Sequence, residues 1–168
     1  MRILGIDPGS RATGFGLVDG AAGRLRLVDA GTVRPGRDLS LPDRLRVIHE
    51  ALLELVDRHG PAVMAVESVF SARNPRSSLV LGQARGAILL AAALRDVPVA
   101  EYAPREVKMA VTGNGAAVKE QVRFMVVRLL GLARPPASLD ASDALAVALC
   151  HLLREKGRRT LAGKGAGG

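Results

Sequence analysis

The stretch ILGIDPGSRATG, residues 3–14, decides the fold, because an apolar strand runs directly into Asp7. Pro8 and Gly9 follow at once, and both residue types favour tight turns. A carboxylate at the end of a buried strand is costly unless a neighbouring group compensates for it. Two interpretations of Asp7 are therefore open, a turn-forming aspartate and a functional carboxylate.

The periodicity of apolar residues along the rest of the chain predicts one mixed α/β domain. Strands are expected at residues 2–7, 13–19, 24–34, 62–67 and 97–102, and helices at 40–59, 77–96, after 104, at 118–130 and at 139–155. Short turns between the first three strands imply an antiparallel meander, and a helical crossover implies that 62–67 pairs in parallel with 2–7. Residues 1–157 form the predicted domain, and the basic, Gly-rich residues 158–168 form a tail expected to be disordered.

The charge balance favours an anionic partner. The 168 residues include 24 Lys and Arg against 16 Asp and Glu, which gives a formal net charge of +8. Nucleic acid is the simplest partner for such an excess, although a basic surface also serves solubility.

Location is predicted from cysteine content and hydropathy. The single cysteine, Cys150, permits no internal disulfide, which suits a reducing compartment. The longest purely apolar run, residues 87–94, is far shorter than the roughly 18 residues typical of a membrane span. No signal peptide is recognisable in the first residues. We therefore expect a cytoplasmic protein without a membrane partner.

Two carboxylates are expected at one edge of the sheet. Gly5 and Asp7 share a strand face, and Gly5 leaves space for another group to approach. Glu67 also ends an apolar strand. Parallel neighbours would place both acids at the carboxyl edge, where ligands bind in open α/β sheets.

Asp140 and Asp143 are a second pair, three residues apart at the start of the last predicted helix. One interpretation is helix capping. The other follows from the apolar remainder of this helix, which must pack on the sheet and carry both acids inward. Four converging carboxylates repel one another unless a hard divalent cation neutralises them, and oxygen ligands suit magnesium or manganese. Two such ions can clamp the attacking and leaving oxygens of a phosphodiester.

Four motifs together resemble the RuvC family of bacterial Holliday junction resolvases. They are GIDPGSRATGFG at 5–16, AVESVF at 65–70, LGQARG at 81–86 and DASDALAVALCH at 140–151. The resemblance implies an RNase H-like fold, with a mixed five-stranded sheet flanked by helices. It also implies a homodimer that nicks four-way DNA junctions in pairs during recombination and repair, leaving 5′-phosphate and 3′-hydroxyl ends.

The resemblance further assigns site residues. It maps the family's catalytic acids onto Asp7, Glu67, Asp140 and Asp143, which would hold two Mg²⁺ ions, with Mn²⁺ able to substitute. It assigns DNA-binding roles to Phe70, Lys108 and Lys119. Arg73 and Arg76 are further candidates for contact with DNA phosphates. The branch-migration proteins RuvA and RuvB are the partners that the family implies.

Several of these residues have ordinary alternatives. Phe70 would stack on an unpaired base at the crossover, or else belong to the core. Judged by residue chemistry alone, Lys108 and Lys119 would be ordinary surface lysines, whereas the family resemblance implies that they contact the DNA backbone. The helix at 77–96 is apolar nearly all round, so it is either a dimer interface or wholly buried within one subunit.

The remaining titratable side chains receive no role. Cys150 lies on the apolar stripe of the last helix and is expected to be a core thiol. His49, His59 and His151 are expected to be ordinary, partly exposed histidines.

Three competing functions were weighed. Actin-like and sugar-kinase ATPases share the G-x-D-x-G opening, but they need two such domains and more chain than is present. RuvC-like RNases of the rRNA-processing type lack the combination of E-x-x-F with a long apolar helix. A non-catalytic junction-binding protein would tolerate loss of the acids, and all four are present here.

Overall fold

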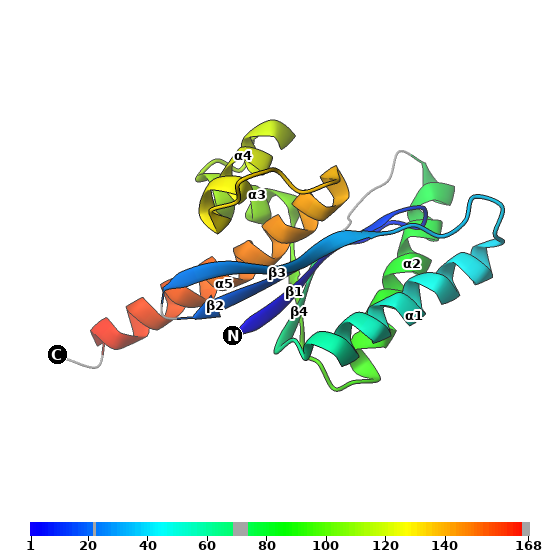
Figure 1. The fold of residues 1–168 in the computed structure, drawn as a ribbon, viewed down its shortest axis with the longest axis horizontal. Coiled ribbons are helices and arrows are strands. Elements are labelled where there is room, and N and C mark those ends of the chain that lie inside the picture. The colour runs from blue at the N-terminus through cyan, green and yellow to red at the C-terminus, as the bar shows by residue number, and fades with distance from the viewer. Residues whose placement is uncertain (22, 69–73, 166–168) are drawn as a thin grey trace.

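The computed structural model describes residues 1–21, 23–68 and 74–165. Its centre is a five-stranded sheet in the order β3-β2-β1-β4-β5, with helices packed on both faces (Figure 1). The strands are β1 (Arg2–Asp7), β2 (Thr13–Ala21), β3 (Arg24–Val33), β4 (Val63–Glu67) and β5 (Val99–Tyr102). The helices are α1 (Leu41–His59), α2 (Pro75–Ala93), α3 (Pro104–Thr112), α4 (Lys119–Leu130) and α5 (Leu139–Gly165).

The strand pairing confirms the predicted fold class. Strand β1 is antiparallel to β2, and β2 is antiparallel to β3. Strand β1 is parallel to β4, and β4 is parallel to β5. The ends of β1 and β4 therefore meet at the same edge, as the crossover rule requires.

Alternation along the strands divides the core into two layers. Ile3 of β1 packs with α3, α4 and α5, whereas Leu4 and Ile6 pack with α1 and α2. Successive side chains of a strand point to opposite faces. Asp7 therefore lies on the same face of the sheet as Ile3, which is the face that α5 covers.

Helix α5 rests directly on the backbone of the sheet. A Cβ atom at Gly5 would lie 2.1 Å from the carbonyl oxygen of Ala144, and one at Gly14 would lie 2.0 Å from that of Asp140. The space that Gly5 leaves beside Asp7 is therefore filled by α5. This close approach brings the start of the helix to the carboxyl edge of the sheet.

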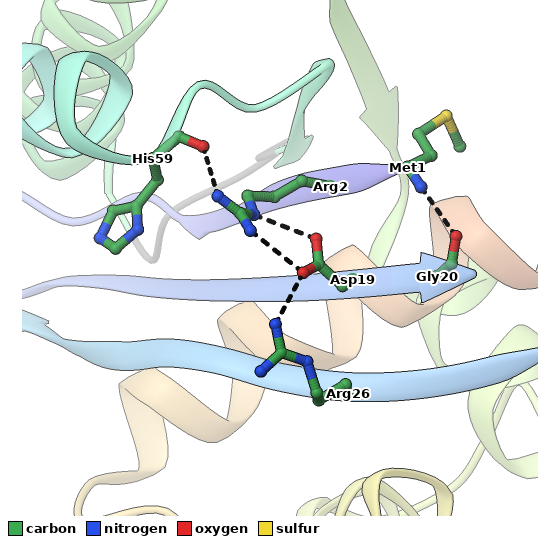
Figure 2. Close-up of polar contacts among 6 residues, drawn as sticks. All are labelled: Met1, Arg2, Asp19, Gly20, Arg26 and His59. Carbon is green, nitrogen blue, oxygen red and sulfur yellow. Dashed lines mark hydrogen bonds and ion pairs between the residues drawn. The ribbon is translucent and has the colours of Figure 1, made fainter.

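The opposite edge of the sheet is held by a polar network (Figure 2). Arg2 donates hydrogen bonds to both carboxylate oxygens of Asp19, at 3.0 and 3.1 Å, and to the carbonyl of His59 at 2.7 Å. Arg26 also donates to Asp19, at 3.1 Å. These contacts connect β1, β2, β3 and the end of α1, so they fix strand register far from the carboxyl edge.

Two helical features differ from the sequence prediction. Helix α5 continues to Gly165, through most of the stretch expected to be a tail, because Arg, Leu and Ala in this stretch are good helix formers. The division of the chain after residue 157 stays a prediction.

The expectation of a partly exposed His151 is wrong, because its Nδ1 makes a buried hydrogen bond with the hydroxyl of Tyr102 at 2.8 Å. Among the described residues, no helix is both long and apolar enough to cross a bilayer.

Candidate active site

A cleft of about 240 Å³ opens at the carboxyl edge of the sheet. Three acids line it, one from the end of β1, one from the end of β4 and one from the first turns of α5, and two lysines from α3 and α4 face them. These residues are Asp7, Glu67, Asp143, Lys108 and Lys119. The structure therefore brings together three of the four acids that the sequence analysis singled out, although they are distant in the chain.

The two strand-end acids are poorly neutralised. Burial, reinforced by the charges of Glu67, Asp143 and Asp140, raises the pKa of Asp7 to about 7. Burial and the neighbouring Asp143 likewise raise the pKa of Glu67 to about 7. Repulsion between carboxylates in a water-poor cleft disfavours the charged forms. A cation placed among them would remove that repulsion.

Lysine 119 supplies part of the missing positive charge. Its Nζ donates to Oδ2 of Asp143 at 3.2 Å, and the charge of Asp143 raises the pKa of Lys119. Lys108, on the other helix of this wall, also acts on Glu67 by lowering its pKa against the larger effect of burial. Both lysines therefore lie where they can face an anionic substrate.

Asp140 lies apart from the cleft lining. Its Oδ2 accepts a hydrogen bond from Nη2 of Arg34 at 3.1 Å, and 34% of its side chain is exposed against 22% for Asp143. The charge of Asp140 nevertheless contributes to the raised pKa of Asp7. Arg34 was not among the predicted site residues, although its position at the end of the predicted strand 24–34 could have placed it at this edge.

The capping interpretation of the α5 acids is wrong, because Ser138 provides the cap. The Oγ of Ser138 accepts from the backbone N–H of Ala141 at 3.0 Å and lies 2.6 Å from Oγ1 of Thr32. This pair anchors the start of α5 to β3. The carboxylates of Asp140 and Asp143 are thereby left available for other partners.

The donor set suits a hard divalent cation, since every candidate ligand is a carboxylate oxygen. Within residues 1–21, 23–68 and 74–165, however, no three acidic, His or Cys side chains are gathered in metal-binding geometry. Two of the four acids instead form ion pairs with basic side chains, Asp140 with Arg34 and Asp143 with Lys119. The fit of a metal therefore rests on donor chemistry and on the uncompensated charge of Asp7 and Glu67.

The other predicted DNA-binding residues are less informative. Phe70 and Arg73 lie outside the described residues. Arg76 is exposed in the first turn of α2, away from the cleft lining.

The raised pKa values predict that the metal-free protein loses stability as pH rises. Both carboxyls bind protons more tightly in the folded state, so their favourable contribution is complete below about pH 4 and disappears as pH rises through about 7. In the presence of a chelator, we expect the free energy of unfolding to fall between pH 5 and pH 8 by roughly 2 kcal/mol more in the wild type than in Asp7→Asn. Calorimetry of both proteins measures this difference. Parallel pH profiles of wild type and variant would contradict it.

The chain is similar in sequence to one family of known proteins over most of its length. The family model for crossover junction endodeoxyribonuclease RuvC matches residues 3–151. Relatives with that name include one from Oleidesulfovibrio alaskensis, 52% identical over 96% of each chain, and one from Alkalilimnicola ehrlichii, 54% identical over 90% of each chain.

Solved structures show the same relation. Thermus thermophilus RuvC in complex with Holliday junction substrate matches with a TM-score of 0.88 and 37% identity, over 94% of this chain and 96% of that one. The yeast mitochondrial Holliday junction resolvase, at 14% identity and a TM-score of 0.68, shares the fold.

Proposed function

This chain belongs to the RuvC family of crossover junction endodeoxyribonucleases, and we propose that it resolves Holliday junctions by nicking two strands symmetrically. The observation that carries the proposal is the cleft in which Asp7, Glu67 and Asp143 face Lys108 and Lys119. Such a site combines acids for divalent ions with cations for a phosphodiester. The RNase and ATPase alternatives receive no comparable support from the comparisons.

We propose that Asp7, Glu67, Asp140 and Asp143 together hold two Mg²⁺ ions, for which Mn²⁺ can substitute. The raised pKa values of Asp7 and Glu67 support a cation there, because a cation would favour their charged forms. When bound, such ions activate a water and stabilise the departing 3′ oxygen of a phosphodiester. Asp140 and Asp143 must exchange their present cationic partners, Arg34 and Lys119, for this role.

We assign Lys108, Lys119 and three residues that follow β4 in the sequence to DNA binding. Lys119 lies beside Asp143 and can place its charge near the scissile phosphate, while Lys108 holds the backbone from the same wall of the cleft. The match of AVESVF to the family supports stacking of Phe70 on an unpaired base. Arg73 and Arg76 complete the proposal as phosphate contacts.

A homodimer would use the open face of α2. Three leucines lie on this face at helical spacing and are strongly exposed: Leu79 at 65%, Leu90 at 52% and Leu94, which directly follows the helix, at 54%. These exposures exclude burial of the whole helix within one subunit. Gly82 and Gly86 lie on the same open face, with no atom within 4 Å of an added Cβ, so a second helix could approach closely. A two-fold axis through this face would relate two clefts and explain symmetric cutting.

Family membership also supports RuvA and RuvB as partners and the cytoplasm as the place of action. A change in cleavage rate when RuvA and RuvB are added to a purified junction reaction would support the partnership. An unchanged rate would argue against it.

A plasmid with an extruded cruciform tests the function and the paired cutting together. With Mg²⁺ we expect linear product, because two cuts occur within one complex, and with Ca²⁺ we expect binding without cutting. A plain duplex and an RNA hairpin are the control substrates. Equal cutting of duplex and junction, or cutting of RNA alone, would refute the resolvase proposal, and nicked circles alone would refute the paired mechanism.

A further inference from the structure

A second cavity, of about 790 Å³, lies at the same edge of the sheet but on the β3 side. Four arginines line it, one from the loop after β1, one directly after β3, one from the loop before α1 and one from α1 itself. These are Arg11, Arg34, Arg37 and Arg44, and the remaining lining residues are Pro35, Gly36 and Leu39. We call this cavity the arginine pocket.

The arginine pocket carries uncompensated positive charge. Its described lining contains no acidic side chain, and Arg34 makes its ion pair with Asp140. The Nε atom of Arg44 is buried and has no hydrogen-bond partner among the described residues. Among the described residues, Arg11, Arg37 and Arg44 take part in no ion pair, so an anion in the pocket would be the first group to neutralise their charges. Planar guanidinium groups bind phosphate and carboxylate oxygens through paired hydrogen bonds, and phosphate is the anion that a DNA substrate carries.

The pocket adjoins the catalytic acids through Arg34. The guanidinium of Arg34 is 3.1 Å from the carboxylate of Asp140, so one side chain belongs to both places. In the strand order β3-β2-β1-β4-β5, Arg34 follows one edge strand, whereas α3, which carries Lys108, follows the other edge strand. The acids at the end of β1 therefore lie between two cationic walls.

We propose that the arginine pocket binds a backbone phosphate of a junction arm, on the side of the acids opposite Lys108 and Lys119. This inference rests on the proposed nuclease function and adds a second point of attachment for the DNA. With phosphates held on both sides, the strand would be positioned across the acids rather than tethered at one end. Contacts to phosphate fix register and orientation without reading sequence.

The test replaces two of the three pocket arginines that do not touch a proposed catalytic acid. We expect Arg37→Gln with Arg44→Gln to weaken junction binding about tenfold in Ca²⁺, and to reduce the slope of log affinity against log salt by roughly one for each arginine. Fluorescence anisotropy at several salt concentrations measures both quantities. Arg46→Gln is the matched control, because Arg46 lies on the same helix, is exposed and pairs with Asp43.

Three controls keep the outcome clear. The wild type is first compared on junction and duplex, and equal affinity for the two would count against the proposed nuclease function. Equal junction affinity of the double variant and Arg46→Gln would overturn only the proposal for the arginine pocket. Arg37→Gln by itself, in an exposed loop, repeats the test if the double variant does not fold. Binding of inorganic phosphate that needs Arg37 and Arg44, with unchanged junction affinity, would assign the pocket to a free anion and also overturn the proposal.

Discussion

We expect the replacement of Asp7 by Asn to lower the rate of junction cleavage by about a thousandfold or more, while junction affinity in Ca²⁺ stays within about twofold of wild type. Asp7 is the partly buried acid at the end of the central strand, and its carboxyl interacts electrostatically with the other three acids. An amide keeps the shape but removes the charge that would attract a divalent ion. Binding depends instead on the surrounding lysines and arginines, which the substitution leaves in place.

Initial cleavage rates on a synthetic junction measure the first effect, and anisotropy in Ca²⁺ measures the second. Asp57→Asn is the control, because Asp57 is an exposed carboxylate on α1 that pairs with Arg95. Cleavage at the wild-type rate would exclude a catalytic role for Asp7. Lost binding by a folded variant would mean that Asp7 contributes to DNA affinity rather than to metal binding.

The second large effect is expected from Gly14→Ala, which alters no charged group. The added Cβ would lie 2.0 Å from the carbonyl oxygen of Asp140, and backbone cannot rotate away as a side chain can. The first turn of α5 must therefore move, taking the two α5 acids out of register with Asp7. We expect at least a hundredfold loss of cleavage and roughly 2–3 kcal/mol less stability, as for other overpacked cores.

Gly157→Ala is the matched control, because a Cβ at residue 157 meets no atom within 4 Å. Alanine there should leave cleavage unchanged and raise stability by about 0.5–1 kcal/mol, since glycine is unfavourable within a helix. Denaturant unfolding and junction cleavage are measured on the same preparations. Full activity of Gly14→Ala would show that the position of α5 is not what assembles the cleft.

The sequence predicted the sheet and three cleft acids because local rules determine them. Strand alternation places Asp7 on one face, and the right-handed crossover makes β4 parallel to β1, so the position of Glu67 follows. Asp143 follows from the apolar stripe of α5. None of these inferences requires knowledge of side-chain partners.

What the sequence did not predict depends on contacts between distant segments. The partner of Asp140 is Arg34, 106 residues away in the chain, and His151 is buried because Tyr102 from β5 satisfies it. Periodicity indicates which face of an element is apolar, but it does not identify the polar group opposite. The arginine pocket was missed for the same reason, since its four arginines come from three segments: the loop after β1, the connection between β3 and α1, and α1 itself.

The dependence of the cleft on α5 has a consequence during protein synthesis. Two of the proposed catalytic acids, Asp140 and Asp143, lie in the last element of the fold, and that element also covers β1 and β2. A nascent chain that has left the ribosome only as far as α4 has neither these acids nor a closed core. We therefore expect a chain that ends after α4 to be unable to fold stably or to cleave DNA, so nuclease activity would first arise when α5 closes on the sheet.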